Sequence, residues 1–205
     1  MLPAAAREVL DFWLGDAAGS DEAALNAASS RWFTGGAHVD AEIRERFGAC
    51  IEDALAGGLS DWENDIRARL ALVILLDQFP RNVFRRTARA FAGDARALQL
   101  VRDAVRDNHD KDLRPVERLF LLMPYQHAED IDVQHEGVRL FKQLAEEPVT
   151  DAIGKVLRIS LEYAERHSAI IARFGRFPYR NEVLGRDSTV EEERWLQESG
   201  ERFGQ

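Results

Sequence analysis

The segment "LALVILLDQFPRN", Leu70 to Asn82, decides the fold that the sequence predicts. Its first seven residues are all apolar, and they belong to a helix expected from about Asn64 to Gln78. A helix that is apolar nearly all round is buried inside a larger core, so we expect this one at the centre of the molecule. Pro80 disfavours helical backbone at Phe79, so the helix is predicted to stop there.

Outward from this segment the signals remain helical, with no convincing alternation of apolar and polar residues. We expect further helices from about Pro3 to just before Gly15, from a cap at Asp40 to Gly57, from a cap at Asp94, from Pro115 to Pro124, from about Glu129, from about Thr150 to Phe174, and from a capping box at Ser188 or Thr189. The stretch "SSRWFTGG", residues 29–36, reads as a connector. No Pro-, Gly- or Ser-rich linker divides the chain, which predicts one all-α domain over residues 1–205 with about eight helices.

Composition narrows the classes of partner. The chain has 205 residues, 45% of them hydrophobic, and a formal net charge of −9, which argues against nucleic acid and anionic membranes. The longest apolar run, Leu70 to Leu76, is too short to span a bilayer, and the N-terminus lacks the basic start of a signal peptide. The single cysteine, Cys50, reads as a packed thiol. We therefore expect a cytoplasmic location.

The ending of the central segment has an echo, "FGRFPYRN", at Phe174 to Asn181. Short connections favour antiparallel neighbouring helices, so the third, fifth and seventh expected helices should end on one side of the molecule. The motifs "DQFPRN", "MPYQHAED" and "FGRFPYRN" would then meet at one rim. Two of them carry basic clusters and the middle one an acidic cluster, so opposite charges would face each other there.

Helical periodicity predicts that polar side chains extend from this rim into the interior of the protein. On the seventh expected helix the apolar stripe runs through His167, so that side chain should point inward. Asp77 and Asp130 continue apolar stripes in the same way, and buried polar groups need partners. Those partners could be one another, water or a ligand. The arginines could equally cap helices and form structural ion pairs, and both interpretations stay open at this point.

These motifs also carry a family resemblance. "LALVILLDQFPRNVFRRTARAFAGDARAL", "FLLMPYQHAEDIDVQ" and "RFGRFPYRNEVLGR" resemble the bacterial family called domain of unknown function 924, over nearly the whole chain. Members of that family are similar to tetratricopeptide-like folds, which implies an antiparallel helical-hairpin array wound into a right-handed superhelix. The resemblance implies no settled catalytic residue, cofactor or substrate. Ala128 departs from the family pattern, where serine is expected.

Motif positions carried over from the family include Phe91 and Asp94 beside the site candidates. The candidate acid–base residues are His127, Glu129, Asp130 and His167, with Glu129 or Asp130 orienting His127. The candidate ligand-binding residues are Asp77, Gln78, Arg81, Asn82, Gln134, Arg176, Arg180 and Asn181. No metal site is expected, because the spacing of these residues matches no tight ligand motif.

Three functions follow in order of preference. The first is a site for a small anionic metabolite, in a binding protein or an enzyme, with Arg81 and Arg180 holding a carboxylate or phosphate. The second is a protein–protein scaffold of the tetratricopeptide-like kind, which would bind a peptide in a groove. The third is a metal-dependent hydrolase that uses His127, Glu129, Asp130 and His167. The sequence leaves the oligomeric state open.

Overall fold

The computed structural model describes residues 1–18, 22–34 and 36–199, and over these ranges it contains helices and no strand. The α-helices are α1 (Ala4–Trp13), α2 (Glu22–Thr34), α3 (Gly36–Leu55), α4 (Ile66–Val73), α5 (Phe79–Val83), α6 (Asp94–Arg106), α7 (Pro115–His127), α8 (Ile131–Ala145), α9 (Asp151–Phe174) and α10 (Val190–Ser199). Short 3₁₀ turns are η1 (Gly15–Ala18), η2 (Ser60–Asn64), η4 (Ala88–Phe91), η5 (His109–Asp112) and η6 (Pro178–Arg180). One π-helical segment, η3 (Ile74–Gln78), joins α4 to α5.

The apolar segment lies at the centre, as its sequence predicts. Every residue from Leu70 to Leu76 is at most 1% exposed. The continuous rod of α4 and η3 contacts α1, α3, α6 and α7 on different sides. Helices packed all round this rod bury the apolar surface that the sequence places on every side of it.

The predicted stop at Pro80 is wrong. Phe79 keeps right-handed helical backbone and donates its N–H to the carbonyl of Ile74, five residues earlier, and α5 continues through Pro80 to Val83. A π-turn widens the helix, which lets a proline follow without breaking the rod. Gly93 packs closely against this turn, since an added Cβ would lie 2.2 Å from the carbonyl oxygen of Leu76.

The predicted end at Pro124 is also wrong, because α7 runs on to His127. Proline removes one backbone hydrogen bond, but Leu121, Leu122 and Tyr125 on either side of it are buried, and their packing keeps the turn helical. The expected connector "SSRWFTGG" is wrong for residues 29–34, which belong to α2.

Two predicted caps lie inside helices instead. Asp40 is an internal residue of α3, and its carboxylate accepts a hydrogen bond from Asn82 at 2.8 Å. Asp94 is the first residue of α6, whose N-cap is Gly93. The capping box at Thr189 is confirmed, with Glu192 and Thr189 hydrogen-bonded to each other's backbone N–H groups.

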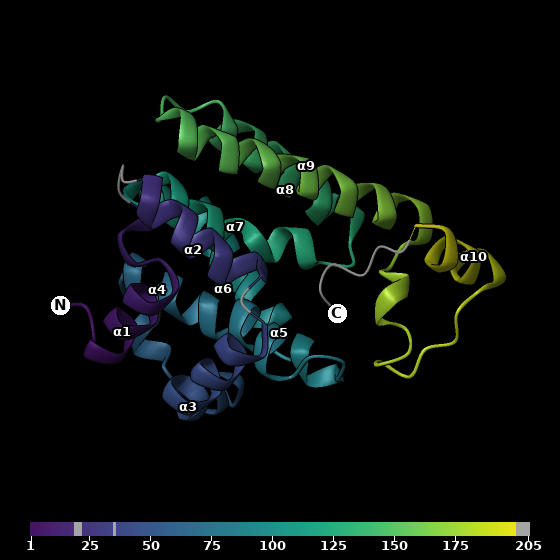
Figure 1. The fold of residues 1–205 in the computed structure, drawn as a ribbon, viewed down its shortest axis with the longest axis horizontal. Helices are drawn as coiled ribbons and strands as arrows, with labels where there is room; N and C mark the ends of the chain where they lie inside the picture. Colours follow the sequence, from purple (N-terminus) through teal and green to yellow (C-terminus); the bar gives the residue numbers. More distant parts are fainter. Residues whose placement is uncertain (19–21, 35, 200–205) are drawn as a thin grey trace.

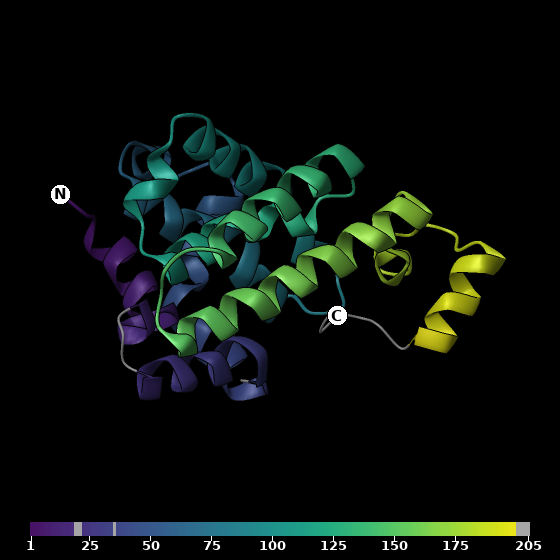
Figure 2. The same cartoon turned by 90° about the horizontal axis from the view of Figure 1, so that it is seen from above.

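The long helices α8 and α9 lie side by side (Figures 1 and 2). In the view of Figure 1 they form one edge of the molecule, and α1 and α3 lie at the opposite edge. Figure 1 also shows α10 beyond the C-terminal end of α9. The main core runs from α1 to α9. A smaller apolar cluster, formed by Ile170, Ile171, Phe177 and Tyr179, joins the C-terminal segment to the end of α9.

Candidate functional site

Asp77 and His127 form the central contact of a polar cluster that lies between these two apolar regions. Asp77 lies in η3 and is 0% exposed. Its Oδ1 lies 2.7 Å from Nδ1 of His127, the last residue of α7, and Gln78 donates its side-chain amide to Oδ2 at 2.5 Å. The π-turn places the carboxylate there, because it widens the helix at the point where Asp77 faces the end of α7. π-turns of this kind occur frequently at functional sites.

Electrostatics fix the protonation of this pair. Burial by itself raises the pKa of the Asp77 carboxyl, but the charge of Arg81 and the contact with His127 outweigh it and hold that pKa below its usual range. Burial, followed by the charge of Arg81, lowers the pKa of His127. Asp77 is therefore ionised and His127 neutral at pH 7, with the imidazole proton on Nδ1 directed at the carboxylate. Nε2 is left with a lone pair as a hydrogen-bond acceptor.

The Nε2 atom of His127 is open to a further partner. Among residues 1–18, 22–34 and 36–199 no group hydrogen-bonds it, and the side chain keeps 16% of its surface exposed. A carboxylate that orients a histidine whose other nitrogen is open is an arrangement suited to general acid–base chemistry.

His167 lies on α9 beside this pair. It is 4% exposed, its ring centroid lies 6.2 Å from that of His127, and the rings meet edge-on at 69°. Burial and the nearby His127 lower the pKa of His167 to about 3. The neutral ring donates its Nδ1 proton to the carbonyl of Tyr163 at 2.7 Å. The sequence-based expectation of an inward-pointing His167 is met by this burial.

Arg81 clamps a second carboxylate. Its guanidinium donates to both oxygens of Asp94, at 2.8 and 2.9 Å, and to the backbone carbonyl of Asp77 at 2.7 Å. This two-bond fork is the geometry in which arginine recognises carboxylates. Asp94 therefore begins α6 and also accepts the two hydrogen bonds of Arg81. The second role was not evident in the sequence, because an aspartate is common at the start of a helix.

Arg180 completes the cluster from η6. It is 4% exposed, and its NH1 lies 3.4 Å from Asp94. The guanidinium carbon lies 4.4 Å from the ring centroid of Phe91 and 4.5 Å from that of Phe177. In the part of the chain that the structure describes, its buried Nε has no hydrogen-bond partner. Arg180 thus retains a donor, Nε, that the described residues do not satisfy.

We call Asp77, Arg81, Asp94, His127, His167 and Arg180 the junction cluster. Its two carboxylates balance its two guanidiniums, and its histidines are neutral. Of the predicted residues, Asp77, Gln78, Arg81, His127, His167 and Arg180 come together here. Phe177 and Tyr179, whose rings surround Arg180, were not predicted; their only sequence signal is their position beside Arg180 in "RFPYRN".

The other predicted site residues have partners outside the junction cluster. Asp130 caps α8 by accepting from the N–H groups of Asp132 and Val133, and Gln134 donates to the carbonyls of Gln126 and Ala128. Asn82 binds Asp40, Arg176 forms a fork with Glu192, and Asn181 donates to Ser188. The carboxylate that orients His127 is Asp77, whereas the sequence suggested Glu129 or Asp130.

Glu129 instead holds the C-terminal segment in place. Its carboxylate accepts two hydrogen bonds from Arg186, at 2.5 and 2.9 Å, and one from the N–H of Phe177 at 2.8 Å. Burial raises the pKa of Glu129, but these hydrogen bonds outweigh it and lower that pKa overall. The contact fixes the loop that carries Phe177 and Arg180 against the end of α7.

Residues 1–18, 22–34 and 36–199 contain no group of three or more His, Cys, Asp or Glu side chains placed to hold a metal ion. Within the same ranges, no helix combines the length and apolar character needed to cross a membrane.

The fold and the junction cluster define an all-α protein with a buried Asp–His pair next to an Arg–Asp–Arg cluster. The model of the family described as bacterial protein of unknown function (DUF924) matches residues 9–200, and the chain belongs to this family. A solved structure of a protein of unknown function, ATU0120 from Agrobacterium tumefaciens, is similar to this chain, with 35% sequence identity and a TM-score of 0.79. The match covers 95% of this chain and 98% of that one. No curated protein matches the sequence.

Proposed function

We propose that the junction cluster binds a small anionic molecule and that His127 exchanges a proton with it. The observation that carries the proposal is the 2.7 Å contact between Asp77 and Nδ1 of His127, which leaves Nε2 as an acceptor in a cluster that contains two guanidiniums. A ligand would be recognised by two features at once: an anionic group for arginine and a hydroxyl or other proton donor for Nε2.

The arginine chemistry favours a carboxylate. Arg81 already holds Asp94 through two hydrogen bonds, so its guanidinium is presented in the orientation that suits a planar anion. Arg180 has a spare, buried donor at Nε, and an anion that reached it would satisfy that group. We infer that the ligand's anionic group binds Arg180. The same group also accepts hydrogen bonds from Arg81, either together with Asp94 or in place of Asp94.

Access to the cluster is from the side of Asp94, His127 and Arg81, whose side chains are 20%, 16% and 12% exposed. Asp77, His167 and Arg180 lie deeper, each at most 4% exposed. In such a dry site, hydrogen bonds to charged groups are stronger than in water. In an enzyme, Asp77 would hold the tautomer of His127, and Nε2 would take a proton from the substrate.

A panel of short carboxylates, hydroxycarboxylates and phosphate monoesters tests the proposal by calorimetry. We expect saturable binding of one anion class to the wild type, weakened at least tenfold in Arg180→Met and in His127→Gln. Arg173→Met is the matched control, because Arg173 lies in the last turn of α9, its side chain is 52% exposed, and its ion pair with Glu191 is exposed on both sides. Equal binding by Arg180→Met and the wild type, or no binding by any member of the panel, contradicts the proposal.

Because Arg180→Met could unfold the protein, circular dichroism accompanies each variant. The ¹⁵N shifts of His127 in the wild type give a second test that needs no substitution. Titration with the bound anion should perturb Nε2 more than Nδ1.

One observation favours the alternative of a protein–protein scaffold. Ile159 and Tyr163 lie one turn apart on α9 and are 39% and 41% exposed. Helices α7, α8 and α9 also pack in consecutive order, as hairpin arrays do. The tetratricopeptide-like superhelix stays a prediction, and Tyr163→Ser would impair a partner complex without affecting anion binding.

A further inference from the structure

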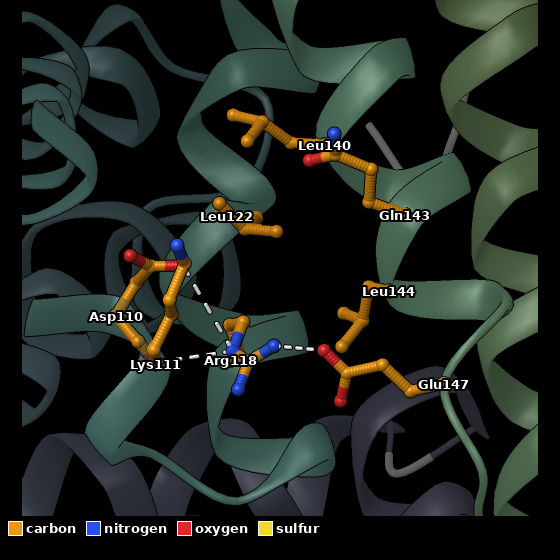
Figure 3. A pocket seen from close by; sticks show the side chains of 8 residues that line it. All are labelled: Asp110, Lys111, Arg118, Leu122, Leu140, Gln143, Leu144 and Glu147. Carbon is orange, nitrogen blue, oxygen red and sulfur yellow. Dashed lines mark hydrogen bonds and ion pairs between the residues drawn. The ribbon is translucent and has the colours of Figure 1, made fainter. Parts of the chain in front are cut away.

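A cavity of about 460 Å³ lies apart from the junction cluster, between η5, α7 and α8 (Figure 3). Leu122, Leu140 and Leu144 line one part of it, and Asp110, Arg118 and Glu147 line another. Ligand sites of small molecules fall in this size range and combine an apolar lining with a few polar groups.

Asp110 is the unusual group in this cavity. Its side chain is only 9% exposed, and its closest cationic atom, Nε of Arg118, lies 3.9 Å away, beyond hydrogen-bonding distance. Among the described residues, no other residue donates a hydrogen bond to the carboxylate. Burial raises the pKa of Asp110, although the charge of Arg118 opposes that effect. Such a carboxylate has the capacity to accept hydrogen bonds from a ligand in the cavity.

The cation closest to Asp110 is already engaged. Arg118 donates to the backbone carbonyls of Asp110 and Leu113, at 3.0 and 3.2 Å, and its NH1 is paired with Glu147. Lys111 is exposed and donates to Asn108 at 2.8 Å. Of the two acidic side chains that line the cavity, Asp110 is the more buried, at 9% exposed against 31% for Glu147, and three leucine side chains line the same cavity.

We propose that this cavity binds a small primary alkylammonium ion, with the ammonium group on Asp110 and the alkyl chain against Leu122, Leu140 and Leu144. The ammonium donates hydrogen bonds to the carboxylate. Its charge is drawn to Asp110 because Glu147 already neutralises Arg118. The short apolar chain gains by leaving water.

A homologous series from propylammonium to hexylammonium tests this by NMR titration of the full chain. We expect saturable shifts confined to η5, α7 and α8, with affinity rising about fourfold for each added CH₂ until the cavity is full. Asp110→Asn should weaken binding at least tenfold. Asp112→Asn is the matched control, since Asp112 lies on the same short turn and is exposed.

Carboxylates of the same chain lengths provide a charge-reversed arm. Tighter binding of the carboxylates, equal binding to Asp110→Asn, or no saturable shift with any ammonium ion would overturn the assignment. If Asp110→Asn does not fold, nuclear Overhauser contacts between the ligand chain and the methyl groups of the three leucines decide the question in the wild type. Their absence at saturation would overturn it as well.

Discussion

His127 on α7 donates its Nδ1 proton to Asp77 in the π-turn of the central rod, across 2.7 Å. This contact joins residues 50 positions apart and links the most buried segment of the fold to the edge where three motifs meet. The acid–base role that we propose for His127 depends on it, because it sets which imidazole nitrogen faces a ligand.

Removal of the carboxylate held by Arg81 provides the first prediction. Asp94→Ala leaves Arg81 its ion pair with Asp77 but removes the acceptors of two of its hydrogen bonds, and it should cost about 1 to 3 kcal/mol of unfolding free energy. Added sodium acetate should restore part of this loss in thermal unfolding, and sodium chloride at equal ionic strength should not. Equal effects of the two salts would show that the vacated space does not select a carboxylate.

A second prediction concerns the close approach of Gly93 to the π-turn. The methyl group of Gly93→Ala would lie 2.2 Å from the backbone oxygen of Leu76, which cannot move without shifting the rod. We expect a loss of about 3 kcal/mol in unfolding free energy, measured in urea. Gly48→Ala, within α3, meets nothing within 4 Å and should be neutral or stabilise by up to about 1 kcal/mol. Similar stability of the two variants would contradict the packing described here.

The attachment of the C-terminal segment gives a third prediction. Glu129→Gln removes the charge that holds Arg186 and weakens the bond to the N–H of Phe177. Amide exchange at residues 176–189 should accelerate at least tenfold. Glu191→Gln is the control, because its pair with Arg173 is exposed on both sides, and it should leave exchange nearly unchanged. Unchanged exchange in Glu129→Gln would count against the proposed attachment.

A fourth prediction follows from the buried histidine. The pKa of His167 is lowered to about 3 in the folded protein. Below pH 6.5, therefore, the unfolded chain binds a proton at this residue, whereas His167 in the folded protein stays neutral until the pH approaches 3. His167 therefore lowers stability as pH falls from 6.5 toward 3, by about 1.4 kcal/mol per pH unit. The lowered pKa of Asp77 acts in the same direction only at more acidic pH, below about 3.9.

Urea unfolding at pH 7.0 and 4.5 measures this effect. The difference between the two pH values should be smaller in His167→Gln than in the wild type. His109→Gln, which alters a residue on the η5 turn at the other end of α7, is the control for the loss of a histidine. An unchanged difference in His167→Gln would show that His167 does not stay neutral in the folded protein.

The sequence was enough to predict that the three motifs lie close together, because antiparallel neighbouring helices would place alternate helix ends on one side of the molecule. It also placed His167 inward, since its position continues an apolar stripe. It could not foresee the π-turn, because the wider turn depends on packing around Pro80. The clamp of Arg81 on Asp94 was concealed for a related reason: an aspartate at the start of a helix looks like an ordinary cap.

The partners of several motif residues were equally hidden. Arg176 and Asn181 resemble ligand-binding groups in the sequence, yet their partners are Glu192 and Ser188, which follow in the same segment. Such pairs depend on the path of a loop, and composition and periodicity carry no information on that path.

The tautomer of His127 tests the central claim most directly. Long-range ¹H–¹⁵N correlation spectra of the full chain at pH 7 distinguish a protonated imidazole nitrogen from an unprotonated one. We predict that Nδ1 of His127 carries the proton and that Nε2 shows the shift of an unprotonated nitrogen. A proton on Nε2, or on both nitrogens, would contradict the orientation by Asp77 and remove the acceptor on which the proposed site depends.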